Sequence, residues 1–64
     1  MNINHTEYPK TLKNKSDDSL RYIIKDCRET LAVNPNGSKA GYYMDEIHYC
    51  AMELKARADK AAKA

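Results

Sequence analysis

The 64-residue sequence has room for one small domain, and a domain of this size buries a smaller fraction of its surface than a larger one does. Its net charge of +2 and its interspersed acidic and basic residues disfavour a dedicated nucleic-acid-binding domain, which normally carries a concentrated basic face. No apolar run approaches the roughly 20 residues that span a bilayer, and no secretory leader is recognisable, so we expect a soluble cytoplasmic protein.

Small chains usually need a disulfide, a metal or an oligomeric interface in addition to their own core. The two cysteines, Cys27 and Cys50, could pair across a helical hairpin. We expect free thiols instead, because both fall on apolar helix faces and no dense cysteine framework indicates an oxidising compartment. We therefore expect an oligomeric interface to bury the apolar surface that the small core of one chain cannot.

The N-terminal residues, 1–14, lack a periodic apolar pattern. The Tyr8-Pro9 pair favours an extended or turn conformation, because the residue before a proline is disfavoured in the helical region. We therefore predict an irregular, flexible arm over residues 1–14 and a helical hairpin over residues 15–64. Part of the arm near Tyr8 and Leu12 is expected to lie over the hairpin.

The first predicted helix covers about residues 16–33. Ser16 can accept a hydrogen bond from a free backbone N–H as the N-cap, and Asp17 and Asp18 place negative charge at the positive end of the helix dipole. Apolar residues then recur at helical spacing, so they share one face of the helix. These residues are Leu20, Ile23, Ile24, Cys27 and Leu31.

A turn is predicted at residues 34–37, where the sequence Asn-Pro-Asn-Gly combines a proline with residues that tolerate turn conformations. A second helix is predicted over about residues 38–61, with Ser38 as its N-cap. Because the turn is short, the two helices should pack antiparallel as a hairpin. The second helix has a heptad seam formed by Ala40, Tyr43, Ile47, Cys50 and Leu54.

The apolar stripe of the second helix is wider than one short partner helix can cover, because Met44, Ala51 and Ala58 flank its seam. The sequence therefore predicts an all-α fold in which the hairpin dimerises into a four-helix bundle. The expected dimer core consists of Leu20, Ile23, Ile24, Cys27, Leu31, Tyr43, Ile47, Cys50 and Leu54.

Three of the five tyrosines occur in the first half of the second helix. Tyr43 falls in the seam, whereas Tyr42 and Tyr49 are one heptad apart on a neighbouring stripe that also carries acidic residues. Tyrosine is enriched at protein interfaces because it combines apolar area with a hydrogen-bonding tip. The stripe either seals the flank of the homodimer or binds another protein. As a partner-binding surface it would comprise Tyr22, Tyr42, Asp45, Glu46, Tyr49 and Glu53.

No catalytic or phosphate-binding motif of useful specificity is present, so we expect no enzyme activity, no cofactor and no bound metal. Asp45 and His48 have a spacing found in di-iron helical bundles, and Asp26 or Glu29 of a second copy could add ligands. The plainer interpretation, a surface Asp and His pair, is favoured. His48 and Cys50 face different directions on a helix, which removes the adjacency that a thiolate and its base require.

Two runs between Lys13 and Leu54 carry a resemblance to known sequences, the opening S-D-D-S-L-R-Y-I-I-K-D and the later A-G-Y-Y-M-D-E-I-H-Y-C-A-M-E-L. With these runs the segment resembles small, mostly uncharacterised accessory proteins of tailed bacteriophages. The resemblance brings no motif of known chemistry. It implies an accessory protein that binds a host protein in the host cell cytoplasm to block defence or redirect a host process.

The leading interpretation is a non-enzymatic homodimer that binds and modulates or inhibits one bacterial host protein, in host takeover or anti-defence. One alternative is a nucleic-acid-associated dimer that uses the lysine clusters near both ends, which salt-dependent DNA or RNA binding would support. Another is a dimer pocket that captures a small nucleotide, which thermal stabilisation by nucleotides would support.

Overall fold

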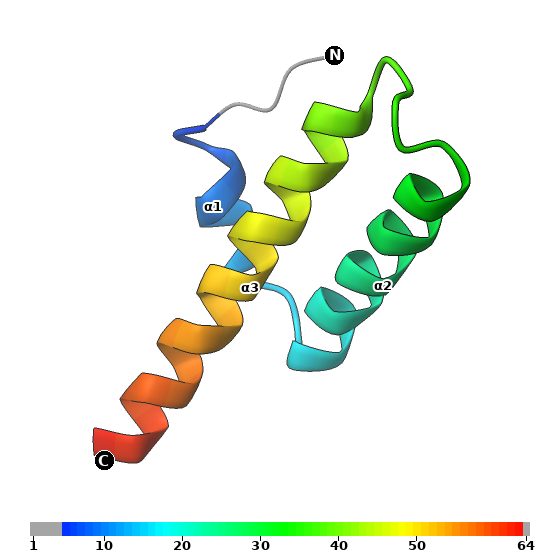
Figure 1. The fold of residues 1–64 in the computed structure, drawn as a ribbon. Helices are drawn as coiled ribbons and strands as arrows, with labels where there is room; N and C mark the ends of the chain where they lie inside the picture. The colour runs from blue at the N-terminus through cyan, green and yellow to red at the C-terminus, as the bar shows by residue number, and fades with distance from the viewer. Residues whose placement is uncertain (1–4, 64) are drawn as a thin grey trace.

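The chain folds into three α-helices, and the computed structural model describes residues 5–63 (Figure 1). Helix α1 spans Tyr8–Leu12, α2 spans Asp17–Val33 and α3 spans Ala40–Lys63. Helices α2 and α3 form an antiparallel hairpin, and α1 packs against α3. The predicted all-α fold with a helical hairpin is confirmed. No helix within residues 5–63 is long and apolar enough to cross a bilayer.

Helix α2 begins after Ser16, which is its N-cap as predicted. The backbone N–H of Ser19 donates to Oγ of Ser16 at 3.1 Å, and this bond satisfies a donor that has no partner inside the helix. Asp17 and Asp18 occupy the first turn, next to the positive end of the helix dipole. The helix ends at Val33, before the residue that precedes the proline.

Helix α3 begins at Ala40, one residue later than the predicted N-cap at Ser38 implies. Successive turns occupy the connection, because the N–H of Gly37 donates to the Asn34 carbonyl and the N–H of Ala40 donates to the Gly37 carbonyl, both at 3.1 Å. The carbonyl of Lys39 then accepts from the N–H of Tyr43 at 3.1 Å. Lys39 therefore stands at the N-cap position, and the prediction of Ser38 is wrong.

Helix α1 corrects the prediction of an irregular arm. Pro9 lies in its first turn, where a helix needs no N–H donor and where the fixed φ of proline suits the helical backbone. A helix of five residues is too short to show a hydrophobic period, so the sequence pattern gave no sign of it. Residues 1–4, the rest of the predicted arm before His5, lie outside the described residues.

The core of the protein is small, and all three helices contribute to it. Leu12 of α1, Leu20 of α2 and Cys50 of α3 are fully buried and form one cluster. Half-buried apolar side chains pack around this cluster; they are Tyr8, Ile23, Ile24, Tyr49 and Leu54. Helix α1 therefore supplies one of the three fully buried side chains of the cluster.

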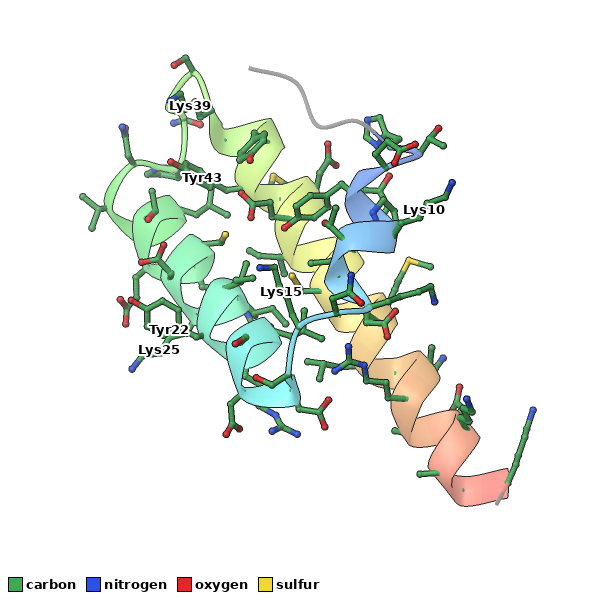
Figure 2. The ribbon with its side chains drawn as sticks, turned by 180° about the vertical axis from the view of Figure 1, so that it is seen from behind. Lys10, Lys15, Tyr22, Lys25, Lys39 and Tyr43 are labelled. Carbon is green, nitrogen blue, oxygen red and sulfur yellow. The ribbon has the colours of Figure 1, made fainter. Side chains whose placement is uncertain are left out.

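The molecule is thin, with extents of 42 × 23 × 15 Å. In Figure 1 helix α1 lies behind α3, and in Figure 2, which is seen from behind, it lies in front of α3. Helix α1 therefore covers one side of the α2–α3 hairpin. On the opposite side, which faces the viewer in Figure 1, no helix of the described chain lies over the hairpin.

Candidate protein-interaction surface

The acidic and aromatic stripe of α3 is where α1 is seated. The hydroxyl of Tyr8 donates to Oε2 of Glu46 at 2.9 Å, and the rings of Tyr8 and Tyr49 meet at a tilted angle with centroids 6.0 Å apart. His5 forms a hydrogen bond with the Tyr49 hydroxyl. Glu46 and Tyr49, both predicted to bind a partner, are thus engaged by the N-terminal segment of the same chain.

Arg57 joins α3 to the end of α1 and the start of α2. Its Nη2 donates to the carbonyls of Leu12 at 3.1 Å and Lys15 at 2.7 Å, which lie at the C-terminal end of α1 and in the link to α2. Its Nη1 lies 2.6 Å from a carboxylate oxygen of Asp17, and its Nε donates to Glu53 at 2.8 Å. Hydrogen bonds with Asp17 and Glu53 raise the pKa of Arg57.

Arg57 was not among the residues predicted to form the core or a site. One signal could have found it: Arg57 follows Leu54 by three residues, which is the next step of the heptad seam. A guanidinium at this position can satisfy several carbonyls and carboxylates at once because its five N–H donors lie in one plane. Glu53, another predicted partner-binding residue, is held by Arg57 and by an ion pair with Lys13 at 3.7 Å.

The remaining residues of the predicted partner-binding set do not form one surface. Tyr42 is half-buried, with its ring edge-on to Tyr43, and burial is the largest cause that raises the pKa of its hydroxyl. Asp45 is exposed on α3. Tyr22 is 69% exposed and lies on the outer side of α2, next to Lys25 in Figure 2.

Tyr8 makes the stability of the fold sensitive to alkaline pH. Burial is the largest cause that raises the pKa of its hydroxyl, and the hydrogen bond to Glu46 is the next. A raised pKa means that the folded state favours the neutral hydroxyl. This contribution to stability is fully present below the pKa of an unfolded tyrosine, about 10, and is lost as pH rises further.

We therefore expect Tyr8→Phe to lower the free energy of unfolding by about 1–2 kcal/mol at pH 7, because Glu46 loses a hydrogen-bond donor. The variant should also lose less stability than the unmodified protein between pH 9 and 11 (about one unit either side of the ordinary tyrosine pKa). Urea titrations at several pH values measure both effects. Tyr22→Phe, at an exposed tyrosine, is the matched control and should change neither quantity.

The cysteines do not form a reactive centre. Cys27 and Cys50 are buried free thiols, and burial raises the pKa of both, that of Cys27 to about 11. Because the thiolate is the nucleophile, these protonated thiols act at neutral pH as small apolar side chains. Within residues 5–63, no three His, Cys, Asp or Glu side chains gather in a group that could hold a metal ion.

One flank of the α3 stripe is left uncovered. Met44 is 60% exposed, and Ala51, Lys55 and Ala58 follow it at seven, four and three residues, all exposed. At about 100° per residue, this stripe lies nearly half a turn around α3 from the acidic and aromatic stripe that contacts α1. It therefore lies on the side of the hairpin that carries no further helix.

The neighbouring flank of α2 lies on the same side. Leu20 and Cys27 mark the buried side of α2. At about 100° per residue, the side chains of Ile24, Arg28 and Arg21 lie to one side of this buried line. In the antiparallel hairpin that is the side on which Met44 lies on α3. An open hollow of about 390 Å³ lies along this flank. Its lining residues are Arg21, Ile24, Lys25, Arg28 and Glu29.

We name this side of the hairpin the open face. It consists of Arg21, Ile24 and Arg28 of α2 and of Met44, Ile47, Ala51 and Lys55 of α3.

The predicted dimer core divides into two groups. Its buried members, Leu20, Cys27 and Cys50, are covered within the single chain. The others keep partial exposure; they are Ile23, Ile24, Leu31, Tyr43, Ile47 and Leu54. Two of these, Ile24 and Ile47, belong to the open face.

Comparisons with protein-family models, with curated proteins and with solved structures found no match for this chain. The open face is therefore identified by the geometry of the chain itself.

Proposed function

We propose that this chain is a non-enzymatic interaction protein that binds another protein through its open face. The observation that carries the proposal is the exposure of Met44, 60%, beside the half-buried Ile24 and Ile47. These side chains form an apolar strip on the hairpin, bordered by charged residues. Contiguous exposed apolar surface with a polar rim is typical of protein-binding sites.

The position of α1 supports the proposal. Helix α1 closes one flank of the wide stripe on α3, so the stripe does not need a second molecule on that side. The other flank has no such cover among the described residues. Because α1 covers one flank of the α3 stripe, a partner would dock on the other flank.

The resemblance of residues 13–54 to phage accessory proteins supports a biological role for such docking. We propose that the partner is a bacterial host protein in the host cell cytoplasm, and that binding modulates or inhibits it. Host takeover and anti-defence are the processes that this role would serve.

A second copy of the chain is the alternative occupant of the open face. Two hairpins joined by these faces would form the four-helix bundle expected from the sequence, and the half-buried Ile24 and Ile47 support that arrangement. Sedimentation equilibrium distinguishes the two uses. A dimer has twice the 7.3 kDa mass of the chain, whereas a face reserved for another protein leaves the purified chain monomeric.

The test of the proposed function is capture of a partner from bacterial lysate by the tagged chain and by two variants. Met44→Glu places a charge in the apolar strip. The amount of captured partner should fall at least about tenfold, because burying an unpaired charge in an interface costs free energy. Met52→Glu is the matched control, since Met52 is similarly exposed, 54%, on another side of the same helix. Equal capture by both variants would exclude the open face as the binding site.

A further inference from the structure

The open face carries positive charge around its apolar strip. Arg21 and Arg28 border Ile24 on α2, and Lys55 follows Ala51 on α3. All three basic side chains are exposed. Arg21 contacts Asp18 at 3.4 Å, but that carboxylate is 98% exposed, so the pair is screened and weak.

Acidic side chains also lie beside this strip: Asp18 contacts Arg21, and the exposed Asp59 follows Lys55 by four residues on α3. Glu29 lines the hollow on α2, together with the basic Arg21, Lys25 and Arg28. Glu46 and Glu53, the half-buried acids of α3, face the other flank and are bonded to Tyr8 and Arg57. The rim of the open face therefore carries more basic than acidic side chains, with the excess on the α2 side at Arg21, Lys25 and Arg28.

We infer that the partner segment that docks on the open face is an amphipathic helix with acidic residues on both sides of its apolar stripe. This inference rests on the proposed function and names the chemistry of its partner. The apolar stripe of the docked helix covers Ile24, Met44 and Ile47. Its flanking carboxylates meet Arg21 and Arg28 on one side and Lys55 on the other.

The dimensions of the face fit a helix. The exposed stripe from Met44 to Ala58 is about 21 Å long, at about 1.5 Å per residue, which matches a partner helix of about four turns. A helix docked along the open face would pack against both α2 and α3.

The charges of the open face favour an acidic helix over a second copy of the chain as the docked molecule. Docking two open faces together brings the basic rim of one copy against the basic rim of the other, and like charges at an interface are destabilising. Asp18, Glu29 and Asp59 offset part of that repulsion, and the excess of basic side chains remains. An acidic helix gains from all three basic residues.

The direct test is fluorescence anisotropy with two synthetic helical peptides of about four turns. Both carry leucine at helical spacing; one has glutamate on both flanks of the stripe and the other has lysine. The chain should bind the glutamate peptide at least about tenfold more tightly than the lysine peptide. Raising the ionic strength from about 0.05 to 0.5 M should narrow this difference, because salt screens exposed charge pairs.

Two triple variants test whether the basic residues of the open face cause the preference for the glutamate peptide. R21E/R28E/K55E reverses the rim and should weaken binding of the glutamate peptide at least about tenfold while strengthening binding of the lysine peptide. K10E/K60E/K63E makes the same change in net charge at exposed lysines outside the open face and should leave the preference intact. Circular dichroism checks that both variants remain helical.

Equal effects of the two triple variants would overturn the inference, because binding would then follow net charge alone. Absence of binding by the glutamate peptide would also overturn it. A dimer of the purified chain that Met44→Glu dissociates would show that a second copy occupies the face. Where Met44-dependent capture from lysate persists without binding of the glutamate peptide, the inferred partner chemistry fails and the interaction function stands.

Discussion

Leu12→Ala is expected to lower the free energy of unfolding by about 2–5 kcal/mol, the usual cost of emptying a fully buried leucine site. Leu12 is 0% exposed and meets Leu20 and Cys50 in the central cluster, so its loss removes the fully buried apolar contact of α1 with the hairpin. A domain of this length has a total stability of about 3–10 kcal/mol. The variant should therefore be partly unfolded at 37 °C.

Urea denaturation followed by circular dichroism measures this change. Leu31→Ala is the matched control, because Leu31 is the same residue type in α2 but keeps partial exposure. The control should cost clearly less stability than Leu12→Ala. If Leu12→Ala unfolds at the same urea concentration as the unmodified protein, α1 is not part of the cooperative fold.

Arg57→Lys is expected to lower the melting temperature by several degrees although it preserves the positive charge. The guanidinium reaches the carbonyls of Leu12 and Lys15 and the carboxylate of Asp17 from one side chain. A lysine ammonium has three donors on a single nitrogen and cannot span these separated acceptors. The C-terminal carbonyls of α1 are then left to solvent, and α1 loses its second attachment.

Thermal unfolding of Lys60→Arg provides the control for Arg57→Lys. Lys60 lies in the same basic end of α3 and is exposed, so exchanging it should leave the melting temperature unchanged. The decisive comparison is the double variant Leu12→Ala with Arg57→Lys. Because both side chains hold α1 on α3, their effects should be non-additive, with the double variant close to Leu12→Ala alone.

The helical hairpin was predictable because its signals are local. Ser16 with two following aspartates marks the start of α2, and the heptad seam of α3 is long enough to be recognised. Helix α1 gave no such signal, since Tyr8-Pro9 by itself favours an extended conformation. Its helical form depends on the burial of Leu12 against α2 and α3, which is a tertiary contact that sequence periodicity does not encode.

The candidate site was predictable only in part for the same reason. The excess width of the α3 stripe, from Met44 on one flank to Tyr49 on the other, follows from the sequence. Which flank the chain covers itself does not, because that depends on where α1 docks. The tyrosine-rich flank, expected to meet a partner, receives Tyr8 and α1, whereas the Met44 flank lies open.

Site-specific photo-crosslinking in bacterial cells that produce the chain shows whether a partner docks on the Met44 flank of α3. A photoreactive phenylalanine derivative replaces Met44 in one variant and Met52 in the other, since both positions are exposed on α3. We expect one discrete crosslinked protein from position 44 and none of comparable yield from position 52. Crosslinking of the same protein from position 52 alone would contradict this expectation.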